Sequence, residues 1–336
     1  MLTIEKSKLS EMLVLLNNDY QVIVPTKADN LTQYAAYDKV AVQEAELYLG
    51  ENPTMSPKYL FLPQSEAMYA FKANGKKLAI AELTPQQEKM RLLFGVRHCD
   101  IRGIACLDEV FLDERHVDPQ YLEKRKNTVI IALACNETKP SCFCESMDIN
   151  RTEADKDVAD VQVYESADSY AFMALSNKGE AVLAKIKDLG SEKEIAAPKV
   201  SEQKIKVETK GLPEKLSGMF YDEIWNNFMF KCIGCGTCTF VCPTCYCFDI
   251  NNKIRGDEGV KLRTWDSCMF DEYMLMAGGH NPRPTKKERV RNRFLHKLEY
   301  FYENYQMMLC TGCGRCLQKC PMNIDIVKFI KTVNAK

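Results

Sequence analysis

One cysteine pattern occurs twice near the C-terminal end of this 336-residue chain. Three cysteines at two-residue intervals are followed, three residues later, by Cys-Pro, and the pattern begins at Cys232 and again at Cys310. This spacing lets a tight loop wrap a 4Fe-4S cubane, while the fourth cysteine ligates the other cubane. The pattern therefore predicts two cubanes. The first has Cys232, Cys235, Cys238 and Cys320 as ligands, and the second has Cys310, Cys313, Cys316 and Cys242.

Zinc is the alternative metal for such cysteines, because C-x2-C units also form zinc ribbons. A zinc ribbon uses only two cysteines per unit, so it has no need for the third and fourth cysteines or for Pro243 and Pro321. The spacing favours bacterial-type ferredoxin clusters over zinc. We therefore expect a chain that carries electrons.

The chain has 16 cysteines, and we expect no signal peptide, because Glu5 and Glu11 interrupt the apolar residues near its start. So many thiols in a cytoplasmic protein indicate metal binding rather than disulfides. The longest apolar runs, such as 128–135, are shorter than a membrane span. We therefore expect a cytoplasmic chain without a membrane span.

The length suits about two domains. Residues 1–200 are expected to form an α/β (or α+β) domain, 201–212 a polar linker, and 213–336 a mainly helical, bacterial-type ferredoxin-like domain. The interval between the two cysteine runs is longer than a minimal ferredoxin needs, so residues 246–305 are interpreted as an insert with a role of its own.

Hydrophobic periodicity predicts the elements of both domains. Strands are expected at 20–24, 59–62, 91–96, 128–134 and 161–164, and helices at 4–16, 101–111, 180–186, 214–230, 286–305 and 325–333.

Four N-terminal cysteines form a second candidate set: Cys99, Cys135, Cys142 and Cys144. Cys99 and Cys135 follow two predicted strands, and parallel neighbours would bring both to the carboxyl edge of the sheet, where α/β folds place ligands. A third cubane would fit there. Ordinary buried thiols and a zinc site are the alternatives, because this arrangement matches no standard cluster run. Cys106 is expected in the core.

Three further cysteines, Cys245, Cys247 and Cys268, have no clear assignment. They could donate hydrogen bonds to cluster sulfides or ligate another metal, and buried thiols beside a cluster are the plainer interpretation. A cubane needs four cysteines, so these three predict no additional cluster.

A basic stripe follows in the insert. Lys286, Arg289, Arg293 and Lys297 share one face of a predicted helix. Such a stripe is usually solvated; docking of an acidic partner and compensation of cluster charge are the two functional alternatives.

Two other classes of function are disfavoured. An enzyme with its own catalytic residues is one of them, because the sequence has no G-x-G-x-x-G loop, P-loop or H-E-x-x-H pair and only four histidines. Nucleic-acid binding is the other, because Phe294 is the one aromatic residue among the charges of the basic stripe. We therefore predict no catalytic residues and no nucleic-acid partner.

Several motifs occur in a fixed order along the chain. They are Gly95-Val96-Arg97-x-Cys99-Asp100, Cys135, Cys142-Phe143-Cys144, Cys242-Pro243-Thr244-Cys245-x-Cys247, Trp265-x2-Cys268, Gly278-Gly279-His280, Arg289-x-Arg291-x-Arg293-x2-His296-Lys297 and the two cysteine runs. This order resembles the family of iron-sulfur proteins that includes the electron-transfer subunit of anaerobic sulfite reductase and the β subunit of sulfhydrogenase. The resemblance implies that Cys99, Cys135, Cys142 and Cys144 hold a third 4Fe-4S cluster. Cys106 lies outside the pattern.

The resemblance also implies an electron relay within a larger enzyme. A partner flavoprotein with FAD and a 2Fe-2S cluster would oxidise NAD(P)H, and this chain would pass the electrons to a catalytic subunit. That subunit carries sirohaem in sulfite reductases and nickel-iron in hydrogenases. An anaerobic, NADH-dependent sulfite reductase is the first expectation, and the β subunit of a sulfhydrogenase or of another flavin-based redox complex is the alternative.

Overall fold

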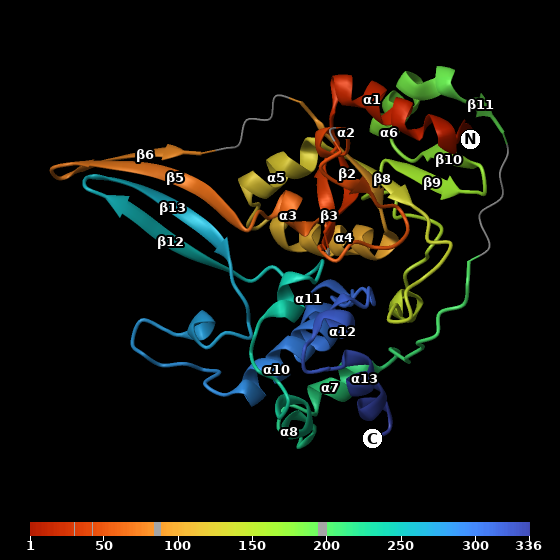
Figure 1. The fold of residues 1–336 in the computed structure, drawn as a ribbon. Helices are drawn as coiled ribbons and strands as arrows, with labels where there is room; N and C mark the ends of the chain where they lie inside the picture. Colours follow the sequence, from red (N-terminus) through yellow and green to blue (C-terminus); the bar gives the residue numbers. More distant parts are fainter. Residues whose placement is uncertain (30, 42, 84–88, 194–199) are drawn as a thin grey trace.

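The computed structural model describes residues 1–29, 31–41, 43–83, 89–193 and 200–336. Its main sheet has the strand order β11-β1-β10-β9-β8-β7-β2-β3, and β4 also pairs with β2 (Figure 1). The strands are β1 Leu2–Glu5, β2 Gln21–Ala28, β3 Leu31–Ala36, β4 Glu46–Leu47, β7 Arg91–Val96, β8 Thr128–Leu133, β9 Val161–Glu165, β10 Ser169–Ala174 and β11 Ser191–Glu192.

The centre of this sheet is parallel. Strands β2, β7, β8 and β9 run side by side in one direction, whereas the outer strands pair antiparallel. Every residue of β7 and β8 is buried. Continuous apolar strands of this kind are typical of parallel sheets covered on both faces.

Helices cover both faces of the sheet. On one face, α1 (Leu9–Asp19) and α6 (Asn177–Ile186) pack against Leu92 and Phe94 of β7. On the other face, α4 (His98–Phe111) and α5 (Pro119–Lys126) pack against Leu93. The alternation along β7 follows from the two-residue period of a strand. Two short helices complete this region, α2 (Asp38–Ala41) and α3 (Lys58–Phe61).

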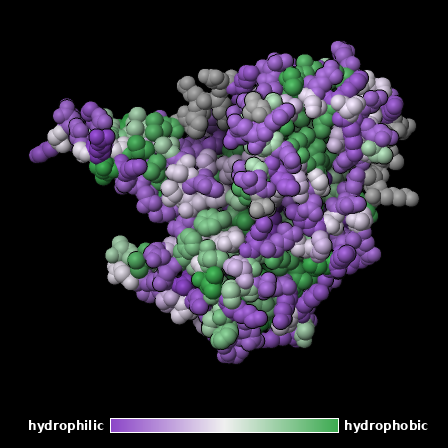
Figure 2. Space-filling view, in the orientation of Figure 1, coloured by the Kyte–Doolittle hydropathy of each residue, from purple (hydrophilic) through white to green (hydrophobic). Residues whose placement is uncertain are grey.

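A second sheet projects from the body as an arm (Figure 1). Its strand order is β12-β13-β5-β6, with β5 Ser65–Asn74, β6 Lys77–Glu82, β12 Phe248–Arg255 and β13 Glu258–Trp265. Two hairpins far apart in the sequence thus form one sheet. Hydrophobic residues gather on its surface, among them Ile80 and Ile254 (Figure 2).

The C-terminal region packs helices around the two cysteine runs. They are α7 Leu212–Ser217, α8 Ile224–Met229, α9 Thr237–Phe240, α10 Lys286–Leu295, α11 Phe301–Tyr305, α12 Arg315–Lys319 and α13 Ile326–Asn334. A π-helical turn, His296–Tyr300, joins α10 to α11. Trp225 stacks on Phe329, whose ring also contacts Phe228 and Phe294. Single 3-10 turns occur at Lys6–Lys8, Cys144–Met147, Lys187–Leu189 and Glu272–Met274.

Most of the predicted elements are confirmed. The strands expected at 20–24, 91–96, 128–134 and 161–164 correspond to β2, β7, β8 and β9, and the helix at 286–305 is continuous through its π-helical turn. The strand expected at 59–62 is wrong, because these residues belong to helix α3. A four-residue apolar run has no period that separates a strand from a buried helical turn.

Two expected helices are also shorter than predicted. The N-terminal helix starts at Leu9, since residues 2–5 form the edge strand β1. The helix expected at 214–230 is divided into α7 and α8 around Gly218, whose helix-breaking tendency ends α7. The strands of the arm were missed altogether.

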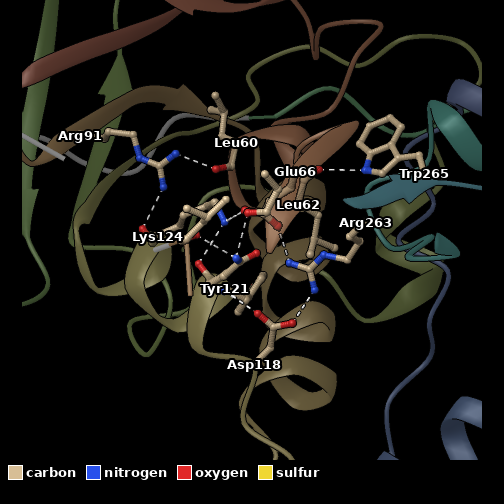
Figure 3. Close-up of polar contacts among 12 residues, drawn as sticks. Leu60, Leu62, Glu66, Arg91, Asp118, Tyr121, Lys124, Arg263 and Trp265 are labelled. Atoms are coloured by element: carbon tan, nitrogen blue, oxygen red, sulfur yellow. Dashed lines mark hydrogen bonds and ion pairs between the residues drawn. The ribbon is translucent and has the colours of Figure 1, made fainter. Parts of the chain in front are cut away.

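A buried ion network joins the arm to the body (Figure 3). Glu66, at the start of β5, accepts hydrogen bonds from Lys124 of α5 and from Arg263 of β13, the latter at 2.5 Å. Arg263 also donates to Asp118, which caps α5. The side chains of Glu66, Lys124 and Arg263 are at most 5% exposed. One carboxylate therefore holds two strands of the arm and one helix of the body together.

Replacement of Glu66 by Ala should strongly destabilise the protein. Removing one member of a buried ion pair leaves the other charge without compensation, which costs about 3–5 kcal/mol. Urea denaturation, followed by circular dichroism, measures this loss. The control is Glu258→Ala, because Glu258 forms an exposed pair with Lys72 on the same sheet and such pairs contribute little. Equal stability of the two variants would contradict the structural role of the network.

Candidate iron-sulfur centres

The two cysteine runs have the same backbone shape. In each run a glycine with a left-handed backbone, Gly236 or Gly314, stands immediately before a short helix, α9 or α12. A side chain would strain this conformation, and a Cβ atom at Gly236 would lie 2.8 Å from the ring of Phe270. The sequence repeat is therefore a structural repeat as well.

The first predicted set of cysteines lines a single pocket. Cys232, Cys235 and Cys238 come from the first run, and Cys320 reaches the same pocket from the end of the second run. Met269, Val290 and Phe294 are among the apolar residues of its wall. Cys320 of the second run thus lies with three cysteines of the first run, which is the grouping that the spacing predicts for this set.

The second predicted set lies deeper in the protein. Cys310 and Cys313 are buried, and burial raises the pKa of the Cys310 thiol to about 11 and that of Cys316 to about 12. Cys242, from the first run, approaches this set, because Thr244 Oγ1 contacts Cys242 Sγ at 3.3 Å and donates to the backbone oxygen of Leu309, next to Cys310, at 2.7 Å. Thiols with raised pKa values keep their protons until a metal displaces them.

The four N-terminal cysteines also line one pocket. Strands β7 and β8 are parallel neighbours, as predicted, so Cys99 and Cys135 lie beyond the same edge of the sheet. Cys142 and Cys144 come from the turn that follows and line the same pocket. Burial raises the pKa of Cys142 to about 11 and that of Cys144 to about 12. Four soft ligands therefore face one space.

Hydrogen-bond donors surround this N-terminal set. Gln203 Nε2 donates to Cys144 Sγ at 3.1 Å, and Asn52 Nδ2 lies 3.9 Å from Cys99 Sγ. Both side chains are buried. Sequence reasoning missed them, because a single Asn or Gln far along the chain from the cysteines gives no pattern. Gln203 belongs to the segment 201–212 that was expected to be a linker, and here it contacts the candidate site directly.

Two residues of the predicted basic stripe are buried and face cysteines. Lys297 Nζ lies 3.2 Å from Cys242 Sγ, and it also donates to Thr244 Oγ1 at 2.9 Å. Arg293 interacts electrostatically with Cys238 of the first set and with Cys316 and Cys242 of the second set. Both cations are at most 5% exposed. This placement supports compensation of cluster charge rather than partner docking for these two residues.

The rest of the stripe has other surroundings. Arg289 Nη1 is paired with Asp271 at 2.6 Å, and Lys286 is exposed at the start of α10. A buried lysine outside the stripe, Lys58 of α3, donates instead to the backbone oxygens of Thr239 and Cys245. Desolvation by burial lowers the pKa of Lys58 to about 8. Sequence reasoning did not identify this lysine.

The three unassigned cysteines contact other cysteines, and Cys245 contacts Cys242 of the second set. The Cys245 thiol bonds to Cys242 and, together with the Lys297 ammonium, holds the pKa of Cys242 well below its usual range. The Cys268 thiol bonds to Cys247 and lowers its pKa to about 6. These contacts fit the interpretation of hydrogen-bonding thiols next to a cluster. Cys106 is fully buried in a separate core with Phe301 and Leu309, as expected.

Within the described residues, no group of three or more His, Cys, Asp or Glu side chains is placed to hold a single metal ion. No helix in the same part of the chain is long and apolar enough to cross a membrane.

Comparison with known proteins identifies the family. A family model described as a 4Fe-4S dicluster domain matches residues 231–324, a range that contains both cysteine runs. Sulfhydrogenase 2 subunit beta of Pyrococcus furiosus is 32% identical over 290 residues, which cover 83% of each chain. The chain belongs to this iron-sulfur subunit family. No solved structure matches it.

As a member of this family, the protein is an electron-transfer iron-sulfur subunit with a 4Fe-4S dicluster domain. The alignment with the β subunit extends far beyond the range of the dicluster domain, so the N-terminal region belongs to the family as well.

Lys297→Gln should lower the midpoint potential of the cluster that Cys242 ligates. Reduction adds negative charge to a cubane, and the buried ammonium stabilises that charge. A shift on the order of 50 mV is expected for the loss of a charged hydrogen bond. Potentiometric titration followed by electron paramagnetic resonance measures it. Lys286→Gln, on the same helix but exposed, is the control, and an identical potential in both variants would contradict the role of Lys297.

Proposed function

We propose that this subunit relays single electrons through three 4Fe-4S clusters. The ligands would be Cys232, Cys235, Cys238 and Cys320 for the first cluster, Cys310, Cys313, Cys316 and Cys242 for the second, and Cys99, Cys135, Cys142 and Cys144 for the third. The convergence of the last four cysteines on one pocket is the observation that carries the proposal, since they lie outside the matched dicluster domain.

The surroundings of the cysteines suit this role. Cubanes supply one-electron chemistry at potentials that depend on burial, charge and hydrogen bonds to sulfur. Met269, Val290 and Phe294 give the first pocket apolar walls. Arg293 supplies positive charge at the first pocket, and Lys297 supplies it beside Cys242 of the second set. The chain therefore offers the cations and apolar surroundings that buried clusters need.

The first pocket provides access for a redox partner. Cys235 is exposed, and the neighbouring Ile233 and Phe230 are 59% and 81% exposed. Exposed apolar residues next to a cluster ligand suit the close approach of another subunit. Tyr221, 87% exposed, adds an aromatic side chain to the same region of sequence. We place one partner contact here.

The proposed electron donor is a subunit with FAD and a 2Fe-2S cluster that oxidises NAD(P)H. A hydride carries two electrons, whereas cubanes accept one at a time, so a relay is needed between such a donor and a catalytic centre. The proposed acceptor is the sirohaem subunit of an anaerobic, NADH-dependent sulfite reductase. Sulfite reduction consumes several electrons per turnover, which suits a subunit that stores more than one.

A nickel-iron hydrogenase is the second candidate. The relative from Pyrococcus furiosus is the β subunit of a sulfhydrogenase, so a complex with other subunits is also expected for this chain. The proposed relay is the same in both cases, and only the catalytic partner differs. The fold and cluster type of this chain do not distinguish a sulfite reductase from a hydrogenase, because the catalytic site of either enzyme lies on the partner subunit.

Anaerobic purification of the tagged chain from its native host tests the partner assignment. Sirohaem and flavin without nickel would support the sulfite reductase, whereas nickel with hydrogen uptake would support the hydrogenase. Co-purification with neither cofactor and without a flavoprotein would contradict a relay between such subunits.

The number of clusters is tested by iron and sulfide analysis of the same protein. The wild type should contain about 12 iron atoms per chain, and Cys99→Ser should contain about 8, because the third cubane loses a ligand. Cys106→Ser is the matched control on the same helix and should retain the wild-type content. About 8 iron atoms in the wild type, unchanged in Cys99→Ser, would rule out the third cluster.

A further inference from the structure

The second cysteine run also contacts the N-terminal set of cysteines. Cys313 also lines the pocket of the N-terminal set, together with Cys99, Cys135, Cys142 and Cys144. Its backbone oxygen lies 3.8 Å from Cys142 Sγ. One residue therefore belongs to the second set through its thiol and touches the N-terminal set through its carbonyl group.

The backbone around Cys313 is packed tightly against the turn that carries Cys142 and Cys144. Phe143 N donates to Gly312 O at 2.8 Å. A Cβ atom at Gly312 would lie only 2.6 Å from Cys144 N, and one at Gly314 would lie 2.4 Å from Ser141 Oγ. No side chain larger than a hydrogen atom fits at either position, so the glycines permit direct contact of the two loops.

A buried ion pair fixes the same contact from the side. Arg315, two residues after Cys313, pairs through both terminal nitrogens with Asp100, which follows Cys99 directly, at 2.6 and 2.8 Å. The two side chains are 2% and 0% exposed. Arg315 Nε also donates to Pro53 O at 2.7 Å. Bidentate pairs of this kind restrict orientation as well as distance.

Asn52 connects the two sets directly. Its Nδ2 atom donates to Cys313 O at 3.1 Å and lies 3.9 Å from Cys99 Sγ. The side chain is 7% exposed. Its own backbone oxygen accepts a hydrogen bond from Lys139 Nζ at 3.0 Å, which holds this part of the chain in place. A single amide group thus bridges a ligand of one set and a ligand of the other.

We propose that electrons cross this subunit in single file, from the N-terminal set to the Cys310 set and then to the Cys232 set, or in reverse. Cys313 forms the junction between the first two, and Asn52 is the residue that positions it. The proposal rests on the proposed function, because it requires the third cubane. Each transfer moves one electron, so that one cubane is oxidised as its neighbour is reduced, and no bond or proton changes.

The middle position of the Cys310 set has independent support. Helices α9 and α12, which follow Gly236 and Gly314 of the two runs, pack against each other, and Cys320 of the second run lines the pocket of the Cys232 set. The Cys310 set therefore also adjoins the Cys232 set. The residues around the two outer sets differ in polarity. Exposed Ile233 lies beside the Cys232 set, whereas the Glu51–Lys139 ion pair and Glu137 line the N-terminal pocket. Each end therefore suits a different partner.

Electron paramagnetic resonance of the anaerobic holoprotein tests the order. In the fully reduced wild type, the signal of the third cubane should be broadened by magnetic coupling to a neighbour. The coupling should persist in Cys235→Ser, which removes a ligand of the Cys232 set. Uncoupled signals in a wild type with about 12 iron atoms, or loss of the coupling in Cys235→Ser, would overturn the order while leaving the proposed function intact. A wild type with about 8 iron atoms would instead contradict the third cluster itself.

Asn52→Ala tests the positioning residue and does not remove a ligand. The third cubane should keep its iron but shift to a more negative midpoint potential, because its thiolate ligand loses a hydrogen-bond donor. The coupling to the second cubane should weaken. Asn251→Ala, at an exposed position of β12, is the control. Wild-type potential and wild-type coupling in Asn52→Ala would overturn the role of Asn52.

Discussion

The contact between the loop around Cys313 and the turn at residues 141–144 is the constraint on which the rest of the structure depends. It places two sets of cysteines from distant parts of the chain against one another, with Gly312 and Gly314 at the closest contact. The Arg315–Asp100 pair would be costly to bury alone, since both charges leave water. It is satisfied here by bidentate geometry and by a further bond to Pro53. The pair specifies one relative position of the two regions.

Several buried cations lie around the cysteine runs. Lys58, Arg293, Lys297 and Arg315 are all buried, and each interacts with cysteines or with backbone oxygens next to them. In a medium of low polarity such charges are tolerated only when they are paired. The buried cations are thus placed to balance charge on the cysteines. The helical segment that carries Arg293 and Lys297 is therefore part of the candidate site.

The projecting sheet has a connecting role. Its strands come from residues 65–82 and 248–265, so it joins the N-terminal region to the insert between the cysteine runs. Glu66 ties this sheet to α5, and Trp265 donates from the end of β13 to Leu62 O at 2.9 Å. Exposed Ile80 and Ile254 leave an apolar surface on the sheet. The insert therefore folds with a partner hairpin from the N-terminal region rather than by itself.

The sequence by itself determined the local features. Cysteine spacing predicted two cubane sets with exchanged fourth ligands, and apolar runs predicted the strands that end before Cys99 and Cys135, because these signals lie within short segments. Tertiary structure decided what no local pattern contains. It showed that Arg293 and Lys297 are buried, that β5 pairs with β13 of the insert, and that Asn52 and Gln203 approach sulfur. Such contacts join residues far apart in the chain, and only the packing of the whole fold brings them together.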